Sequence, residues 1–192
     1  MSDNMEKYPT TQQLENEIKR VKHGREYRRI IRNTLSSLLV VAAAAVIISM
    51  LFLPVLRITG TSMEPTLKSD QLVMCRKRSN FERGDIIAFY YNNKILVKRV
   101  IAVSGDMVEI KTDGTVYVNS SKIDEPYVEE KSLGECNIDM PYEVPEQKVF
   151  VMGDNRATSV DSRSTTIGCI SEEAVIGKVV FRVWPFKSIK KL

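Results

Sequence analysis

The sequence predicts a mainly β domain that follows a single N-terminal transmembrane helix. Three observations predict this fold class. Residues 35–53 form an apolar stretch without any charge, the chain after Pro54 contains short β-rich runs, and no long helical pattern interrupts those runs. A chain of 192 residues can hold one domain with a core and a small insertion, but it is too short for two large domains.

Residues 35–53 are the candidate membrane anchor. As a helix they would span about 28 Å, which is close to the thickness of the hydrocarbon layer of a bilayer. A cleavable signal peptide is a competing interpretation, but the bulky residues 50–54 offer no small-x-small cleavage site. A buried core helix is disfavoured because no charged residue interrupts the run.

The charges before the anchor predict its orientation. Between positions 19 and 32 one residue is acidic, Glu26, and the basic residues are Lys19, Arg20, Lys22, Arg25, Arg28, Arg29 and Arg32. The positive-inside rule therefore places the N-terminus in the cytoplasm and the chain after Pro54 outside.

A cytoplasmic helix is expected to lead into the anchor. Thr10 and Gln13 fit a capping box at its start. Apolar residues follow at helical spacing, at Leu14, Ile18 and Val21. We expect this helix to contribute orientation and contact with anionic lipid headgroups.

Seven β-rich runs follow the anchor, at residues 71–76, 85–91, 95–104, 107–111, 115–119, 148–152 and 178–184. Asp113-Gly114 between two of these runs predicts a tight hairpin, because glycine adopts positive φ without steric cost. Residues 120–147 are polar and contain three prolines, which is typical of an inserted lobe or a long loop.

Composition narrows the possible chemistry. The net charge of +4 is modest and gives little support to nucleic-acid binding. Cys75, Cys136 and Cys169 lie too far apart in sequence for a zinc motif, and we interpret Cys75 as a small buried hydrophobic residue. The single histidine, His23, precedes the anchor, so a catalytic base beyond the membrane must be Lys, Asp or Glu.

Two segments carry candidate catalytic residues. Ser62 lies in the turn-rich residues 60–67, where a serine could be exposed. Lys98 lies in a β-rich run whose alternation places it on one face with Leu96, Val100 and Ala102. A lysine buried among apolar residues loses its proton more readily, and its pKa falls from ~10.4 toward neutrality, which makes it a general base. On pattern alone, a lysine that reaches solvent at a strand edge remains the open alternative.

A third segment, residues 153–163, follows the run at 148–152 and is rich in short polar side chains. Such a loop can orient a neutral lysine through a hydroxyl group while Asp–Arg pairs hold its shape. The same composition also fits an ordinary surface turn.

Four segments resemble, in order, the sequence boxes of bacterial type I signal peptidases, and in particular of their Gram-positive members. They are residues 60–67, 84–89, 98–106 and 153–163. The preceding anchor also matches the layout of that family, so the resemblance covers nearly all of the chain after its cytoplasmic segment.

The resemblance implies a Ser-Lys endopeptidase that needs no metal or cofactor. Ser62 matches the nucleophile and Lys98 the general base. The supporting residues implied by the resemblance are Ser159, which positions the lysine amine, the polar pair Asp161 and Arg163, and the bridge between Asp154 and Arg99. The implied partners are signal peptides of exported preproteins, cleaved after small-x-small sites, and the lipid bilayer.

The predicted layout has three parts. Residues 1–33 form the cytoplasmic basic segment, residues 34–54 the anchor, and residues 55–192 the extracytoplasmic catalytic domain. The resemblance places a short inserted lobe at about residues 112–147. One departure concerns the oxyanion hole, because Gram-negative relatives carry a serine where this chain has Gly60. We expect the backbone N–H of Ser62 and a second, unidentified donor to serve instead.

Other function classes remain as alternatives. A self-cleaving repressor-type protease would share the chemistry, but it would need a DNA-binding helix pair in place of the anchor. A penicillin-type S-x-x-K motif is absent at Ser62, since position 65 is proline, and Ser188 to Lys191 lies in a basic tail. The alternative outside enzymes is an anchored β-domain that serves as a binding or scaffold module.

Overall fold

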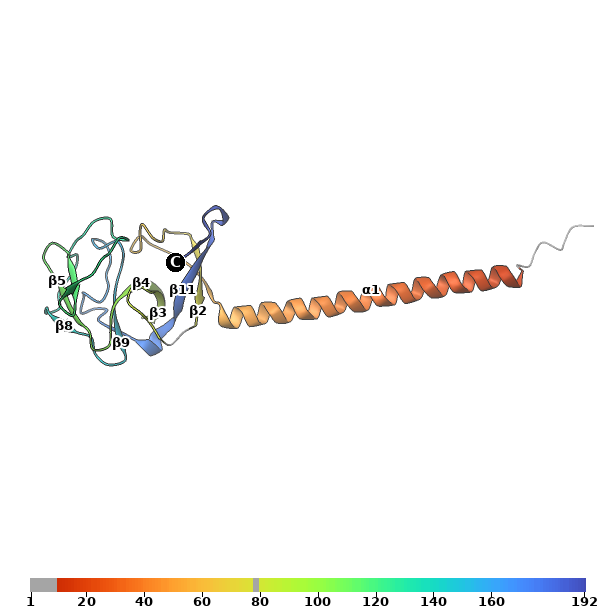
Figure 1. Cartoon of the computed structure of the whole chain (residues 1–192), viewed down its shortest axis with the longest axis horizontal. Helices are drawn as coiled ribbons and strands as arrows, with labels where there is room; N and C mark the ends of the chain where they lie inside the picture. The colour runs from red at the N-terminus through yellow and green to blue at the C-terminus, as the bar shows by residue number, and fades with distance from the viewer. Residues whose placement is uncertain (1–9, 78–79) are drawn as a thin grey trace, which may run out of the picture. The chain divides into compact units, whose positions relative to one another are not determined.

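The computed structural model describes residues 10–77 and 80–192. Contacts divide the chain into two compact units with the boundary after Ser49, and the two units are described separately below. Helix α1 (Thr11–Phe52) accounts for the first unit, and the second unit is built from β-strands with two 3-10 turns, η1 (Glu172–Ala174) and η2 (Phe186–Ser188) (Figure 1).

Helix α1 begins where the capping pattern predicts. The Thr10 N–H donates to Gln13 Oε1 at 2.9 Å, and the Leu14 N–H donates to the Thr10 carbonyl at 3.1 Å. The helix has 42 residues and is about 60 Å long, so it exceeds one bilayer thickness. Among the described residues, one helix is long and apolar enough to cross a membrane, and it is α1. Its large apolar side chains from Leu14 to Ile48 are exposed.

The larger sheet contains eight antiparallel strands within the described residues. Seven of them lie in the order β1-β2-β11-β3-β4-β9-β10, and β12 pairs with β11. Their bounds are β1 (Val55–Arg57), β2 (Leu72–Arg76), β3 (Ile86–Tyr91), β4 (Lys94–Val103), β9 (Lys148–Met152), β10 (Ile170–Ser171), β11 (Val175–Trp184) and β12 (Lys190–Lys191).

A smaller antiparallel sheet has the order β7-β6-β5-β8 among the described residues. Its strands are β5 (Met107–Ile110), β6 (Val116–Val118), β7 (Ser121–Lys122) and β8 (Tyr142–Glu143). In Figure 1, β5 and β8 lie at one end of this unit, and β2 and β11 lie at the other.

The prediction of a mainly β fold is confirmed, and each of the seven predicted runs contains a strand. The predicted hairpin is also present. Val108 pairs with Val118 across it, the Gly114 N–H donates to the Lys111 carbonyl at 2.8 Å, and Gly114 has a φ of 81°.

Within the part of the chain that the structure describes, three hydrophobic clusters form the core. The first lies between the two sheets and joins Ile101 and Phe150 to Val108 and Val116. The second holds β1, β2 and β11 together and includes Cys75, which is fully buried as predicted. The third lies along β3, β4 and β9.

Strand β4 departs from the strict alternation that its sequence suggests. Its pairing with β9 shifts register between Val100 and Ala102, which marks a bulge. Val100 therefore packs in the third cluster and Ala102 in the first, so the expectation that both share one face with Lys98 is wrong. The N-terminal part of β4, which carries Lys98, keeps its regular pairing with β3.

Candidate active site

Ser62 lies in a turn that is anchored on both sides. Met63 and Leu67 are buried in the second cluster, and Gly60 adopts a φ of 85° that favours glycine. The Glu64 N–H donates to the Thr61 carbonyl at 3.0 Å, which closes the turn. Ser62 itself is half-buried, so its position is fixed by neighbours that the core holds.

Lys98 is a buried lysine, with only 4% of its surface exposed. Its Nζ donates to Ser159 Oγ at 2.8 Å. Burial lowers the pKa of Lys98 from 10.5 to about 8. The negative charges of Asp161 and Asp154 oppose this shift, and the positive charge of Arg163 reinforces it. The alternative of a lysine that reaches solvent is therefore excluded, since its amine is enclosed and hydrogen-bonded.

Asp161 organises the loop of residues 153–163. Its carboxylate accepts hydrogen bonds from Ser159 Oγ at 2.7 Å and from the Gly153 N–H at 2.9 Å. Arg163 donates to both of its oxygens, at 2.8 and 2.9 Å. Burial alone would raise the pKa of Asp161, but the hydrogen bonds and charge of Arg163 hold it below its ordinary value. The loop therefore contains an ionised carboxylate whose charge Arg163 balances.

Gly153 connects this loop to the Ser62 turn. A Cβ at position 153 would lie 2.3 Å from Ser159 Oγ and 2.4 Å from the Ser62 carbonyl oxygen. The next contact along the loop is the Asn155 N–H, which donates to that same carbonyl at 3.1 Å. The backbone that carries Ser62 and the hydroxyl that bonds Lys98 thus touch one glycine.

Arg99 and Asp154 form a second link between strand β4 and the loop. Arg99 donates to both carboxylate oxygens of Asp154, at 2.8 and 2.6 Å, and also to the Gly84 carbonyl at 2.8 Å. Its planar guanidinium suits this bidentate pairing. Because Arg99 follows Lys98 directly, the bridge helps to fix the strand position from which the lysine side chain projects.

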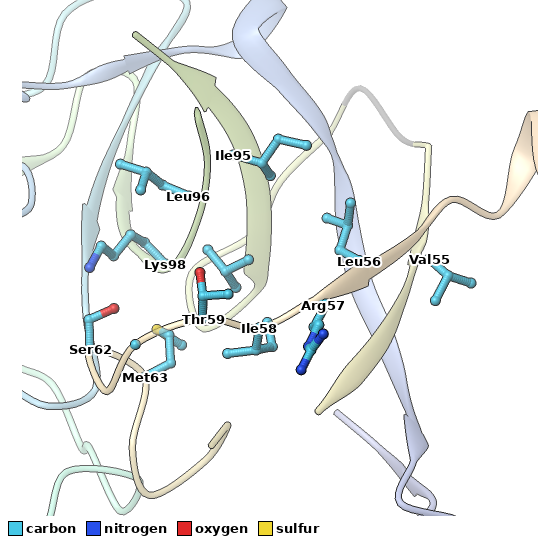
Figure 2. A pocket seen from close by; sticks show the side chains of 12 residues that line it. Val55, Leu56, Arg57, Ile58, Thr59, Ser62, Met63, Ile95, Leu96 and Lys98 are labelled. Carbon is cyan, nitrogen blue, oxygen red and sulfur yellow. The ribbon is translucent and has the colours of Figure 1, made fainter. Parts of the chain in front are cut away.

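A cavity of about 290 Å³ lies beside these residues. It runs between residues 55–63 and 95–98, and both Ser62 and Lys98 line it. Figure 2 shows the Lys98 amine and the Ser62 hydroxyl pointing toward one another at one end of the cavity, with Leu56 and Val55 toward the other end. Most of the other lining residues are apolar, and Arg57 and Thr59 add polar surface, so the cavity can receive small apolar side chains.

No hydrogen bond joins Ser62 Oγ directly to Lys98 Nζ within residues 10–77 and 80–192. The lysine amine is instead held by Ser159. Catalytic hydrogen bonds are often long in a free enzyme and shorten when substrate binds. The arrangement supplies a serine hydroxyl and an amine of lowered pKa at one cavity, which are the components of nucleophilic catalysis.

Two residues near the loop escaped sequence reasoning. Glu125 pairs with the buried Arg156, and the ring of Tyr127 lies 3.9 Å from the guanidinium carbon of Arg99. Both fall in the polar stretch that the sequence marks as a lobe or loop. Nothing in the sequence around Pro126 predicts that its two neighbours are buried or half-buried, so their contacts are visible only in the folded structure.

Comparisons with known proteins identify the family of the chain. A family model described as "Signal peptidase, peptidase S26" matches residues 31–184. Signal peptidase IB of Staphylococcus aureus (strain Mu50) is 40% identical over 154 residues, with 69% of this chain and 78% of that protein covered. Signal peptidase I U of Bacillus subtilis (strain 168) is 35% identical over 176 residues, with 85% and 93% covered.

Solved structures include a signal peptidase I from Enterococcus faecalis V583, which is 31% identical. The match covers 53% of this chain and 97% of that chain, with a TM-score of 0.44. The family match over residues 31–184, together with relatives at 35% and 40% identity, shows that this chain belongs to the signal peptidases of peptidase family S26.

Proposed function

We propose that this signal peptidase cleaves the signal peptides of exported preproteins with Ser62 as nucleophile and Lys98 as general base. The observation that carries the proposal is the enclosed Lys98 amine, whose pKa burial lowers to about 8 and which lines the same cavity as Ser62. The alternative of a binding or scaffold module is not favoured, because the chain belongs to a peptidase family.

The proposed reaction passes through an acyl-enzyme. Neutral Lys98 takes the proton of Ser62 Oγ, which attacks the scissile carbonyl, and the amine then gives that proton to the leaving nitrogen. The backbone N–H of Ser62 and a second donor stabilise the oxyanion. Lys98 next activates the water that releases the acyl group. Ser159 keeps the amine in place throughout, and Asp161 and Arg163 hold Ser159.

The substrate is proposed to bind as an extended strand in the cavity. Among the described strands, β1 pairs only with β2, and residues 94–98 of β4 pair only with β3. Each therefore presents one free backbone edge, and the cavity lies between them. An extended peptide can hydrogen-bond to such edges while its alternate side chains enter pockets. The small volume favours small residues at the first and third positions before the cut.

The proposed location is the outer face of the cytoplasmic membrane. Helix α1 supports anchoring, because one stretch of it is long and apolar enough to span a bilayer. The seven basic residues between positions 19 and 32 support a cytoplasmic N-terminus. Anchoring would concentrate the enzyme and the membrane-bound preprotein in one plane.

The test is preprotein cleavage by variants of the two residues. Ser62→Ala and Lys98→Ala should each lower kcat by at least about 10³-fold, and Lys98→Arg should fail as well because a guanidinium stays protonated. Lys122→Ala, at an exposed lysine of the smaller sheet, is the control and should cleave normally. Cleavage by folded Ser62→Ala or Lys98→Ala at the parent rate would exclude the assigned roles.

A further inference from the structure

Glu125 is buried and Tyr127 is half-buried against the loop of residues 153–163, although both belong to the polar stretch that joins β7 to β8 of the smaller sheet and neither lines the cavity. Glu125 accepts hydrogen bonds from both terminal nitrogens of Arg156, one of them at 3.3 Å. The side chains of this pair are 2% and 0% exposed, respectively. A carboxylate and a guanidinium so deeply buried depend on one another, because neither has water as a substitute partner.

Arg156 links Glu125 to Gly153, the glycine between Ser62 and Ser159. Its Nε donates to the Gly153 carbonyl at 3.1 Å. Gly153 in turn packs between the Ser62 carbonyl and Ser159 Oγ, with no room for even a methyl group. A displacement of Arg156 would therefore move the glycine that spaces the proposed nucleophile from the hydroxyl that holds Lys98.

Tyr127 makes a parallel contact through Arg99. Its ring lies 3.9 Å from the guanidinium carbon of Arg99, which is the residue that grips Asp154. The Tyr127 hydroxyl donates to Glu125 Oε1 at 3.2 Å, so the two residues also support each other. Burial raises the pKa of Tyr127, and the charge of Glu125 raises it further, which keeps the hydroxyl a neutral donor.

We propose that Glu125 and Tyr127 are positioning residues that hold residues 153–156, and through them Ser62 and Lys98, in the geometry needed for catalysis. The inference rests on the proposed roles of Ser62 and Lys98. It gives two residues of the segment between β7 and β8 a part in turnover, although neither lines the cavity in which the substrate is proposed to bind. A purely structural role would lower stability and leave turnover by the folded protein unchanged.

The first experiment measures kcat, KM and the melting temperature of the full chain in detergent, with a peptide that spans a signal-peptide cleavage site. Glu125→Gln keeps the shape of the side chain and removes its charge. We expect kcat to fall about 10- to 100-fold with KM within about twofold of the parent, because misplaced catalytic groups slow chemistry more than they weaken binding. Glu129→Gln, an exposed glutamate nearby, is the matched control and should match the parent in both constants.

A second pair of variants keeps the proposal falsifiable if Glu125→Gln folds poorly. Tyr127→Phe retains the ring over Arg99 and should lower kcat less than about threefold, whereas Tyr127→Leu removes the ring and should lower kcat about tenfold. Equal kcat values for Tyr127→Leu and the parent would overturn the part assigned to Tyr127.

A double variant separates positioning from simple charge balance. Glu125→Leu with Arg156→Met removes both buried charges, so its melting temperature should recover toward the parent value. Its kcat should stay low, because the bond from Arg156 to Gly153 is gone. Recovery of kcat together with stability would overturn the inference, as would a parent-like kcat for Glu125→Gln. If Ser62→Ala is inactive in the same assay, only this inference falls; if Ser62→Ala cleaves, the proposed function falls first.

Discussion

The two sides of Lys98 are built in different ways. On the side of the loop at residues 153–163, the surroundings are polar, buried and joined by hydrogen bonds, from Ser159 through Asp161 to Arg163. On the cavity side the neighbours are mainly apolar, and among the described residues none of them is hydrogen-bonded to the amine. The loop side therefore fixes where the amine lies, and the enclosure of the site makes its charged form unfavourable.

This difference explains how a lysine can sit near a carboxylate and still lose its proton. Asp161 does not bond Lys98 directly, because the Ser159 hydroxyl lies between them. Arg163 also donates to both oxygens of Asp161. Its positive charge offsets part of the attraction between the Asp161 carboxylate and the Lys98 amine. A free carboxylate in contact with Lys98 would instead stabilise its charged form and raise its pKa.

The largest effect on stability is expected on the loop side. Asp161→Asn would leave Arg163 buried without its counter-charge and should lower the free energy of unfolding by about 3–5 kcal/mol at pH 7. The pKa of Asp161 is held low in the folded protein, so its contribution is present above the unfolded value and is lost as the pH falls below about 4. Urea unfolding at pH 7 and in acid measures both effects.

The exposed Asp139→Asn is the control for that substitution and should unfold like the parent. Equal stability of Asp161→Asn and the parent at pH 7 would mean that the loop does not depend on this carboxylate, and the contrast between the two sides would fail.

Removal of the buried charge of Lys98 should stabilise the protein. The folded pKa of about 8 lies below the unfolded value of 10.5, so below pH 8 the charged amine costs about 3 kcal/mol. That cost disappears as the pH rises from 8 to 10.5, because there the unfolded chain binds the proton and the folded protein does not. Lys98→Met should therefore unfold at higher urea than the parent at pH 6, and the gain should shrink by pH 10.

Lys94→Met, at an exposed position of the same strand, should show no such pH-dependent gain. A Lys98→Met variant that is less stable than the parent at pH 6, or equally stabilised at pH 6 and pH 10, would contradict the burial of a costly charge.

A smaller effect is expected on the cavity side. Leu96→Ala enlarges the cavity and leaves the loop of residues 153–163 unchanged. It should raise KM for a small-x-small peptide by about three- to tenfold, because apolar contact with the substrate is lost. Acylation of Ser62 by a small serine-directed probe should stay at the parent rate. Ile189→Ala, which is exposed and does not line the cavity, is the control. A large fall in the acylation rate of Leu96→Ala would show that the two sides are not separable.

Much of the fold could be predicted from sequence, because it depends on local patterns. The strands found by prediction have at least three residues in longer β-rich runs, whereas β7, β8, β10 and β12 have two residues each and carry no period of their own. The bulge in β4 was also missed, since nothing in its alternating sequence marks the residue that leaves the ladder.

The candidate site also has residues that could be predicted from sequence and residues that could not. Short motifs around Ser62 and the loop 153–163 are visible in sequence, and the resemblance they carry indicates the family. The burial of Lys98 was ambiguous from its strand pattern, because an edge lysine and an enclosed lysine have the same neighbours in sequence. Glu125 gave no signal, since its partner Arg156 lies 31 positions away and the pairing depends on tertiary packing.

The most direct test is the pH dependence of Ser62 acylation by a serine-directed probe in the full-length protein. If a neutral Lys98 is the base, the acylation rate should rise with pH through a titration at about pH 8, the pKa that burial gives this amine, and Lys98→Met should abolish the titration. A rate that keeps rising beyond pH 10, as for a solvent-exposed lysine, or an identical profile in Lys98→Met, would contradict the account.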